Sequence, residues 1–494
     1  MKKNFYITTT LPYVNSDPHI GFAMEIIRAD IIARNRTEQG DTVFFNTGTD
    51  EHGLKIYQNA VAQKVSPQEY VDGFAQKFKD LLPLLDIAPT SENRTTNFIR
   101  TTDAHHIKAA QEFWKVCAQN GFIEKATHKI KYCVGCELEK TESELVESRC
   151  PLHPNRDIDT YEEENYFFKF SKFGDSLLKK YKEHEARGDS FVVPQERFGE
   201  IKSFVEGGLN DFSISRLASK MPWGIPVPGD EKHVMYVWFD ALVNYISAVG
   251  WPHNMEQFNE VWNGSGGVVQ YCGKDNLRQQ AAMWQAMLMA AGITPSQKII
   301  INGFIMSNGQ KMSKSLGNVI SPFDLVRDYG VDAVRYFVAQ ELHPFEDSDV
   351  TPERLLQAYN AGLANGLGNL ASRVMKMAET HGVSCGSEGA VLKNGIYEAK
   401  NTEIQNCFAR YNIMQATSVI WQIIQDADKF IQLEQPFKKV KVDAEAAKKD
   451  IAALVFDVQA IGKFLKPVMP QTSQKILDCV AAGKTPATPL FVRK

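Results

Sequence analysis

A histidine and a glycine stand at a predicted strand-to-helix junction near the start of the chain. The stretch "PYVNSDPHIGFAM" (12–24) follows the apolar run 5–7 and leads into the helical pattern "EIIRADIIAR" (25–34). The first N–H groups of a helix are unpaired and lie at its positive end, so phosphates bind there. Gly21 would let the backbone approach a ligand closely, and His19 could donate to a phosphate oxygen. A motif this short is more often an ordinary turn, so it needs support from elsewhere.

Support comes from a positively charged loop about three hundred residues downstream. The stretch "GQKMSKSLGN" (309–318) contains Lys311 and Lys314, with Ser313 and Ser315 beside them and a glycine near each end. Such a loop suits a polyphosphate that must be held while charge develops on its leaving group. Alone, the loop is equally compatible with a solvated lysine segment. Together, the two stretches predict a polyphosphate site assembled from distant parts of the chain.

Three of the eight cysteines cluster with one histidine. Cys133 and Cys136 form "CVGC", and Cys150 and His153 form "CPLH" thirteen residues further on. Three thiolates and an imidazole at this spacing are typical of tetrahedral zinc. A closed four-ligand site predicts one structural ion that stabilises a small insert with little apolar core. The alternative is a set of unliganded side chains.

Two strand–helix–strand patterns must position these residues. The strand-like runs 5–13 and 41–50 flank the helical segment 25–40, and the runs 268–275 and 298–307 flank the helical segment 276–292. This rhythm predicts the α/β class, with a split, doubly wound Rossmann-type parallel sheet. The cysteine cluster lies between the halves, in a charged segment typical of a connective insert.

The β signal disappears after about residue 355. Leu363, Leu367 and Leu370 recur at helical spacing, and the segments 408–431 and 444–465 are also helical in pattern. These patterns predict a C-terminal antiparallel α-helical bundle.

Composition narrows the class of protein. A chain of 494 residues predicts about two to four domains, and a net charge of −4 argues against a uniformly basic DNA-binding protein. We find no signal-peptide pattern, no apolar run long enough to cross a bilayer and no secreted disulfide framework, so we expect a cytoplasmic protein without a membrane partner. With no dimerising segment recognised after the last predicted helix, we expect a monomer.

The motifs, in their order along the chain, resemble the class I aminoacyl-tRNA synthetases and, in detail, the methionyl-tRNA synthetase family. They are "LPYVN" (11–15), "PHIG" (18–21), "GTDEHG" (48–53), "YCVGC" (132–136), "SISR" (213–216), "WGIPVP" (223–228), "YVWFDAL" (236–242), "GKDNLR" (273–278), "KMSKSLGNV" (311–319) and "GNLASR" (368–373). The resemblance covers nearly the whole chain.

The resemblance implies a division of the chain into five parts. Residues 1–113 and 207–320 would be the two halves of the Rossmann catalytic domain, and 114–206 the connective insert with the zinc knuckles. Residues 321–356 would form a linker beside the lysine loop that contacts the tRNA stem. Residues 357–494 would form a helical anticodon-binding domain.

The resemblance also implies a function: ATP-dependent activation of L-methionine to methionyl-adenylate and transfer to the 3′ end of tRNA(Met), with Mg²⁺ accompanying ATP and one structural Zn²⁺. Its catalytic and ATP-binding positions are His19, Gly21, Phe22, Glu25, Gly273, Lys274, Asp275, Lys311, Ser313, Lys314 and Ser315. Its methionine-binding positions are Leu11, Tyr13, Asp50, Trp238, Ala241, Leu242, Tyr245, Asn276 and Gln280. Arg216 and Asp240 would support the adenylate, Cys133, Cys136, Cys150 and His153 the metal, and Asn369, Arg373 and Phe437 the anticodon.

Spacing alone leaves alternatives for several of these residues. Trp238, Leu242 and Tyr245 follow a helical repeat that is more often core than pocket. Arg216 is equally compatible with a surface cation, and Asp240 with a helix N-cap. The helical stripe that contains Asn369 and Arg373 is equally compatible with a solvated helix face.

Four positions depart from the family pattern. Phe22 stands where a second histidine is usual and could only pack beside the adenine or ribose. Asn276 and Gln280 replace an isoleucine and a histidine of the methionine pocket, and Phe437 replaces a tryptophan that stacks on an anticodon base. An altered amino-acid specificity or a catalytically impaired relative therefore stays open.

Rival functions fit less of the sequence. Class I synthetases for branched amino acids carry a far larger editing insert, and those for cysteine place zinc in the amino-acid pocket. A small-metabolite adenylyltransferase would not need the helical half or the zinc insert. A non-enzymatic RNA-binding protein would not need the lysine loop or Asp50.

Overall fold

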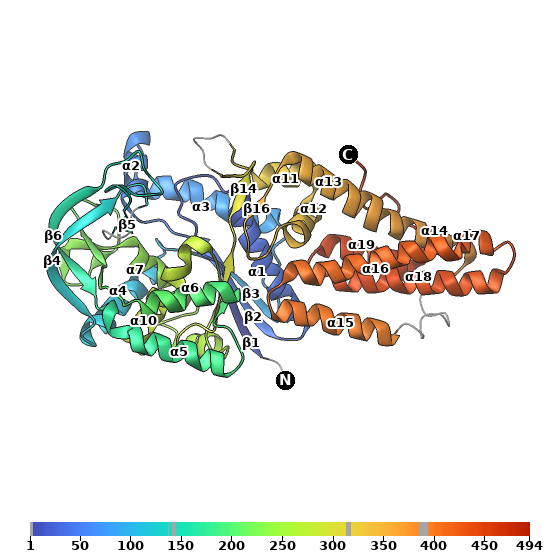
Figure 1. Cartoon of the computed structure of the whole chain (residues 1–494). Coiled ribbons are helices and arrows are strands. Elements are labelled where there is room, and N and C mark those ends of the chain that lie inside the picture. The colour runs from blue at the N-terminus through green and yellow to red at the C-terminus, as the bar shows by residue number, and fades with distance from the viewer. Residues whose placement is uncertain (1–2, 137, 141–144, 313–317, 385–393) are drawn as a thin grey trace.

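The computed structural model describes residues 3–136, 138–140, 145–312, 318–384 and 394–494 (Figure 1). At its centre lies a six-stranded sheet of order β3-β2-β1-β12-β13-β7, in which every neighbouring pair is parallel. The strands are β1 (Asn4–Thr8), β2 (Thr42–Thr49), β3 (Arg94–Arg100), β12 (Val269–Gly273), β13 (Lys298–Asn302) and β7 (Val192–Val193). The predicted split, doubly wound α/β fold is confirmed.

Both faces of this sheet are buried, because its strands alternate between two hydrophobic cores. Phe5 and Ile7 of β1 belong to one core, which continues into the C-terminal helices, whereas Tyr6 belongs to the other. On β13, Ile300 packs into the first core and Ile299 into the second. Near-continuous apolar strands are typical of a parallel sheet covered by helices on both sides.

Helices connect and cover the strands. Helix α1 (Ile20–Glu38) links β1 to β2 and is buried along most of its length. The other helices of this half are α2 (Leu54–Gln63), α3 (Pro67–Leu84), α4 (Ala104–Gln119), α5 (Gly174–Ala186), α6 (Gln195–Glu206), α7 (Val237–Leu242), α8 (Asn244–Ser247), α9 (Met255–Phe258) and α10 (Trp284–Ala290). The helix predicted over 276–292 is divided: a 3-10 turn, η4 (Lys274–Asn276), and a π-helical turn, η5 (Gln279–Met283), precede α10.

The segment predicted as the insert supplies three strands of an antiparallel sheet of order β5-β4-β6-β8, and β8 lies beyond the end of that segment. Its strands are β4 (Ile123–Cys133), β5 (Leu138–Glu139), β6 (Asp159–Phe168) and β8 (Phe212–Ser213). Two strands pair across the boundaries of the predicted parts, β8 with β6 and β7 with β13. Strand β7 lies within 114–206, yet it pairs with β13 as the edge of the central sheet. Two residues, of which Val192 is buried and Val193 half-buried, are too short a pattern to predict a strand.

Two smaller sheets complete the α/β part. One has the order β10-β11-β9, and the other, β15-β14-β16, carries the start of the lysine loop. Their strands are β9 (Ser215–Leu217), β10 (Pro226–Val227), β11 (Asp230–Met235), β14 (Ile305–Ser307), β15 (Gln310–Lys311) and β16 (Ser348–Asp349).

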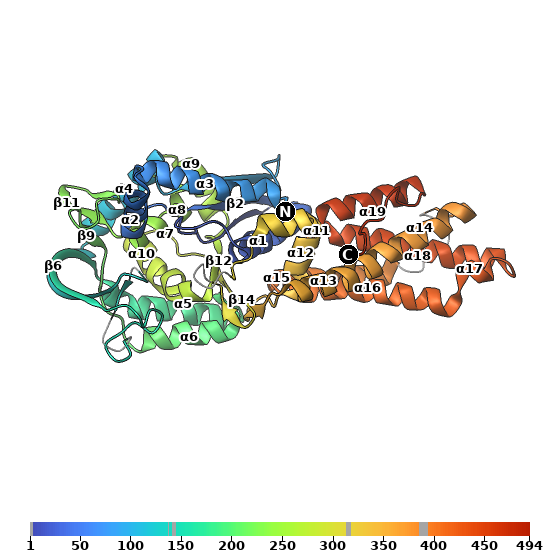
Figure 2. The ribbon, with the colours of Figure 1, turned by 90° about the horizontal axis from the view of Figure 1, so that it is seen from above.

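The C-terminal part is helical, as predicted. Its helices are α11 (Pro322–Tyr329), α12 (Val331–Tyr336), α13 (Pro352–Ala358), η8 (Tyr359–Gly368), α14 (Asn369–His381), α15 (Asn394–Ala409), α16 (Ile413–Glu434), α17 (Pro436–Lys439), α18 (Ala444–Leu465) and α19 (Pro470–Ala482). Figures 1 and 2 show α14, α16 and α18 lying along one another and extending away from the central sheet. The apolar stripe is buried at Leu363, Leu367 and Leu370.

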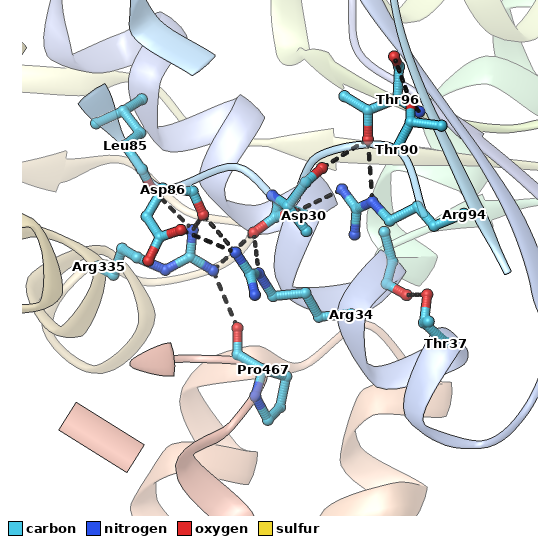
Figure 3. A network of polar contacts seen from close by, with 12 residues as sticks. Asp30, Arg34, Thr37, Leu85, Asp86, Thr90, Arg94, Thr96, Arg335 and Pro467 are labelled. Carbon is cyan, nitrogen blue, oxygen red and sulfur yellow. Dashed lines mark hydrogen bonds and ion pairs between the residues drawn. The ribbon is translucent and has the colours of Figure 1, made fainter. Parts of the chain in front are cut away.

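A buried carboxylate joins the two parts (Figure 3). Asp30, on α1, accepts hydrogen bonds from Arg34 Nε at 2.8 Å, Arg94 Nη2 at 2.7 Å and Arg335 Nη2 at 2.8 Å. Arg335, on α12, also donates to the carbonyls of Pro467 and Val468 between α18 and α19. Burial would raise the pKa of Asp30, but the three arginine charges outweigh it and hold the pKa well below its usual range.

Within the described part of the chain, none of the helices combines the length and the apolar character that crossing a lipid bilayer requires.

Candidate active site

The candidate site lies at the carboxyl edge of the central sheet, between β1 and β12. At this point the strand order runs away in opposite directions, which is where doubly wound sheets bind ligands. A cavity of about 300 Å³ opens there. All nine predicted methionine-binding residues line it: Leu11, Tyr13, Asp50, Trp238, Ala241, Leu242, Tyr245, Asn276 and Gln280.

Backbone pairing holds the acidic end of this cavity. Asp50 directly follows β2, and its backbone N–H donates to the carbonyl of Pro12 at 2.9 Å. The backbone N–H of Val14 donates to the carbonyl of Asp50 at 3.1 Å, so the loop after β1 extends along the end of β2. The lining thus combines the carboxyl group of Asp50 with the aromatic rings of Trp238 and Tyr245. A carboxylate together with an apolar, aromatic lining suits an α-ammonium group with an apolar side chain.

His19 is the N-cap of α1. Its Nδ1 accepts a hydrogen bond from the backbone N–H of Gly21 at 3.1 Å, so a neutral ring carries its proton on Nε2. A Cβ atom at Gly21 would lie 2.8 Å from His19 Cε1, too close for any other residue type without a shift. The first turn of α1 therefore holds the His19 ring in place through the N–H of Gly21 and the close approach of the ring to this glycine.

Phe22 packs on this histidine. The two ring centroids are 4.3 Å apart, and the far side of Phe22 meets Phe78 of α3 edge to face at 5.5 Å. Phe22 also lines the cavity. The residue that replaces the second histidine of the motif thus contacts the first one directly.

The chain just after the lysine loop contacts the same helix start. The backbone N–H of Ile20 donates to the carbonyl of Ile320 at 3.0 Å. Lys311 ends β15, which pairs with β14. The predicted residues Ser313, Lys314 and Ser315 lie outside the described residues.

Of the remaining predicted nucleotide-binding residues, Asp275 lies in the cavity lining and Glu25 is buried outside it. Asp275 lines the cavity, and Lys274 beside it forms an ion pair of 2.7 Å with Asp347. Gly273 permits this turn, because a Cβ there would lie 2.7 Å from Asp275 Oδ1. Glu25 lies behind the cavity and accepts hydrogen bonds from both the N–H and the hydroxyl of Thr10. Burial raises the pKa of Glu25 to about 7, although the bonds from Thr10 oppose the shift.

Arg216 and Asp240 are buried away from the cavity lining. Arg216 donates to Ser213 Oγ at 2.7 Å and packs over the ring of Tyr236, so it is not a surface cation. Asp240 lies inside α7, 3.2 Å from His52 Nδ1, rather than at a helix N-cap. Burial raises the pKa of Asp240 above its usual value, despite the neighbouring imidazole.

The cysteine cluster has the geometry of a tetrahedral metal site. The Sγ atoms of Cys133, Cys136 and Cys150 and a ring nitrogen of His153 all lie within 4.8 Å of one another. Cys136 Sγ is 3.3 Å from Cys150 Sγ and 3.2 Å from His153 Nδ1. Edges of about 3.5–3.8 Å are expected around zinc from its bond lengths, so the donor set fits this ion. A Cβ at Gly135 would lie 2.5 Å from the His153 ring, so a glycine is needed there.

Comparisons with known proteins agree with this geometry. The model of the family "tRNA synthetases class I (M)" matches residues 5–159 and 136–375. The chain belongs to this family. The methionine–tRNA ligase of Thermotoga maritima is 39% identical over 98% of this chain and 76% of its own length, and that of Thermosynechococcus vestitus is 39% identical over 96% and 90%.

A solved member of this synthetase family has the same fold throughout. The structure of Mycobacterium tuberculosis methionyl-tRNA synthetase in complex with methionyl-adenylate is 33% identical to this chain, has a TM-score of 0.90 and is matched over 100% of both chains. The free form of the same protein gives a TM-score of 0.81 at 30% identity.

Eight residues of the cavity lining were not predicted to lie at the substrate site, although Cys136 among them was predicted as a metal ligand. They are Thr10, Pro12, Asn15, Lys55, Gly135, Cys136, Val237 and Asn244. Pro12 and Asn15 lie inside the "LPYVN" motif, which could have indicated them. Gly135 and Cys136 show that the metal knuckle forms part of the cavity wall, for which one sequence carries no signal.

A second hollow lies on the bundle, where this family of synthetases was expected to bind the anticodon. It is a groove of about 580 Å³, lined by Ser372, Arg373, Lys376, Met377, Ile431, Phe437 and Thr485. Phe437 is 45% exposed, which leaves its ring available for stacking. Arg373 pairs with Asp428 at 3.2 Å, and Asn369 lies exposed one turn earlier on α14, outside the lining.

Proposed function

We propose that this chain is a methionine–tRNA ligase, which activates L-methionine with ATP and transfers it to the 3′ end of tRNA(Met). The observation that carries the proposal is the cavity between β1 and β12. It places a carboxyl group, an aromatic lining and the histidine-capped start of α1 around one space. The names of the relatives and the family of the chain support the same reaction.

In the first step, the methionine carboxylate attacks the α-phosphorus of ATP, a new P–O bond forms, and the bond to the β-phosphate breaks to release pyrophosphate. Asp50 would accept the α-ammonium group, and Trp238 and Tyr245 would enclose the side chain. His19, whose Nε2 is left to carry a proton, would donate to a phosphate oxygen. Lys311 and Lys314 would hold the phosphates as charge develops on the leaving group.

Supporting groups complete this assignment. Ser313, Ser315, Gly273, Lys274 and Asp275 would hold the nucleotide with Mg²⁺ bound to ATP, which neutralises phosphate charge. Glu25, Arg216 and Asp240 would act from behind the cavity, because each is buried among protein partners. One Zn²⁺ held by the cysteine knuckles would be structural.

In the second step, a hydroxyl of the terminal adenosine attacks the activated carbonyl, and AMP leaves. Positioning and charge stabilisation would carry both steps, without a covalent enzyme intermediate. Asn369, Arg373 and Phe437 would read the anticodon at the bundle groove. We also propose that the enzyme acts as a cytoplasmic monomer, and a dimer mass at all concentrations in sedimentation would contradict this.

Pyrophosphate exchange into ATP, measured with each of the twenty amino acids in turn, tests the proposal. We expect exchange with methionine alone, followed by methionine-dependent charging of tRNA(Met). Exchange with another amino acid would redirect the assignment. An absence of exchange with every amino acid would contradict an adenylating function.

A further inference from the structure

Behind the aromatic wall of the cavity lies a set of neutral polar side chains. Tyr245 and Gln280 line the cavity, and Gln270, Gln285 and Ser296 lie behind them without touching it. Each of the five is at most 1% exposed. Buried polar groups must find hydrogen-bond partners, and these five find one another.

Backbone groups fix the direction of this chain of hydrogen bonds at its inner end. The backbone N–H of Ser296 donates to Gln285 Oε1 at 2.8 Å, and Gln285 Nε2 donates to the carbonyl of Gln280 at 2.7 Å. These two bonds determine which end of the Gln285 amide is oxygen and which is nitrogen. Gln285 Nε2 also donates to Ser296 Oγ at 3.1 Å.

The direction then passes outward one group at a time. The Ser296 hydroxyl accepts from Gln285 Nε2 and donates its own proton to Gln270 Oε1, which leaves no buried donor of Ser296 without a partner. Gln270 Nε2 then donates to Gln280 Oε1 at 2.8 Å, and Gln280 Nε2 donates to the Tyr245 hydroxyl oxygen at 2.8 Å. In this direction each side-chain amide of the chain both accepts and donates.

The last member of the chain, Tyr245, receives a hydrogen bond and keeps its own proton. Among the described residues, no atom accepts from this hydroxyl, and the residue lines the cavity. Burial raises the pKa of the Tyr245 hydroxyl, so the proton stays on the oxygen. The backbone carbonyl of Tyr245 is held separately by the hydroxyl of Tyr6 at 2.8 Å.

We infer that Gln285, Ser296, Gln270 and Gln280 form a directed hydrogen-bond relay that commits the Tyr245 proton to the cavity. The cavity floor is then a fixed O–H donor, which selects a ligand side chain with an acceptor atom and no donor, such as a thioether. Gln270, Gln285 and Ser296 are positioning residues, because they act through Gln280 and Tyr245. The relay itself consists of neutral amide and hydroxyl groups, whereas Glu25, whose charge acts on Tyr245, has its pKa raised to about 7.

The inference rests on the proposed function, and its test compares two nearly isosteric amino acids. Norleucine carries a CH₂ group in place of the methionine sulfur, so it fills the cavity without accepting a hydrogen bond. The readout is the ratio of kcat/KM for methionine to that for norleucine in pyrophosphate exchange. A variant that is merely misfolded has a lower kcat/KM for both amino acids to the same extent, so the ratio is unchanged.

Three variants probe the relay from its outer to its inner end. Tyr245→Phe removes the donor, and we expect the ratio to fall about 2- to 10-fold through the KM for methionine. Gln280→Glu replaces the amide donor by a carboxylate. When ionised, this carboxylate accepts a hydrogen bond from the Tyr245 hydroxyl, which then no longer donates into the cavity. The ratio for this variant should fall as pH rises and recover at low pH, where the protonated carboxyl group donates again. The wild-type ratio, measured over the same pH range, is the reference and should change less than that of Gln280→Glu.

Ser296→Ala breaks the relay without touching the cavity, and its ratio should fall less than that of Tyr245→Phe. An unchanged ratio in Tyr245→Phe, or a pH-independent, wild-type ratio in Gln280→Glu, would overturn the inference. If no amino acid supports exchange, the proposed function fails instead. Calorimetric binding of methionine and norleucine to the same variants would then test the relay alone, with the same expected ratios.

Discussion

Phe22 acts through the histidine beside it. Its ring covers one side of His19 and is itself held by Phe78, so it restricts the histidine that caps α1. The expectation that Phe22 could only pack beside the nucleotide omitted this contact. The phenyl ring stands where a second histidine is usual. It cannot donate a hydrogen bond, but it supports the ring of His19, which can.

This contact predicts the effect of substituting Phe22. Phe22→Leu should lower kcat/KM for ATP in pyrophosphate exchange about 3- to 10-fold, since an aromatic pair contributes about 0.5–1.5 kcal/mol. Phe22→His should give no gain over wild type, because the imidazole would face the apolar ring of Phe78. A rise in activity in Phe22→His would show that the site still has room for the second histidine.

Glu25 makes stability depend on pH. Its pKa is raised to about 7 in the folded protein from 4.5, so the folded state keeps a proton that the unfolded state loses. The folded state is therefore favoured below about pH 4.5, and this contribution is lost as pH rises towards 7. Glu25→Gln removes the dependence.

Urea unfolding at pH 5.5 and pH 8 measures this effect. Between these values wild type should lose about 2 kcal/mol of unfolding free energy relative to Glu25→Gln. Glu398→Gln, at an exposed position on α15, is the control and should behave as wild type. Parallel pH curves for wild type and Glu25→Gln would show that Glu25 does not titrate in this range.

At the scale of elements, helix α1 serves two parts of the molecule. Its start carries His19 at the cavity, and three turns later its Asp30 binds Arg335 of α12. The same carboxylate holds Arg94 of β3. One helix is thus anchored both to the sheet and to the C-terminal helices.

Asp30→Asn should reduce the unfolding free energy by about 3–5 kcal/mol, because it leaves buried arginine charges without a counter-charge. Urea unfolding measures the change. The matched control is Asp324→Asn, which breaks an exposed pair with Arg327 and should cost less than about 1 kcal/mol. Equal losses in the two variants would contradict a special role for the buried network.

The metal knuckle is predicted to support the cavity as well as the insert. Cys150→Ser should lower the zinc content, measured by elemental analysis, from one ion per chain to none. Because Gly135 and Cys136 line the cavity, the KM for methionine should also rise. Cys479→Ser, on α19, is the control and should keep its zinc. Retention of zinc in Cys150→Ser would contradict the assigned ligands.

The sequence predicted the elements that carry strong periodicity and the residues that lie in motifs. The alternating halves, the helical stripe around Leu367 and the assembled methionine set are examples. It did not predict the π-helical turn η5, whose residues read as ordinary helix, or strand β7. Gln270 and Arg335 were also missed, because polar residues are expected at the surface until their buried partners are known.

At the scale of the whole molecule, the cavity and the bundle groove are separate. Both ribbon views place α17 at the end of the bundle away from the central sheet, with α14 and α16 extending towards it (Figures 1 and 2). The groove that contains Arg373 therefore lies away from the cavity between β1 and β12. Activation of the amino acid and recognition of tRNA can be measured separately.

This separation predicts a selective defect in Arg373→Ala. Loss of a charged hydrogen-bonding group should lower kcat/KM for charging of tRNA(Met) about 10- to 100-fold. The defect should fall on charging rather than on pyrophosphate exchange, which needs no tRNA. Lys475→Ala, at an exposed position on α19 outside the groove lining, is the control for lost surface charge. An equal loss of exchange would show that the substitution disturbs the catalytic half.

The buried relay behind Tyr245 also constrains how this pocket can evolve. Each amide accepts from the group behind it and donates to the group in front, so one substitution leaves two neighbours mismatched. Changes at positions 270, 280, 285 and 296 should therefore be strongly epistatic, as expected for residues of one hydrogen-bond network. A library that aims to give this pocket a new amino-acid preference should vary these four positions jointly, since the effect of a change at one of them depends on the residues at the other three.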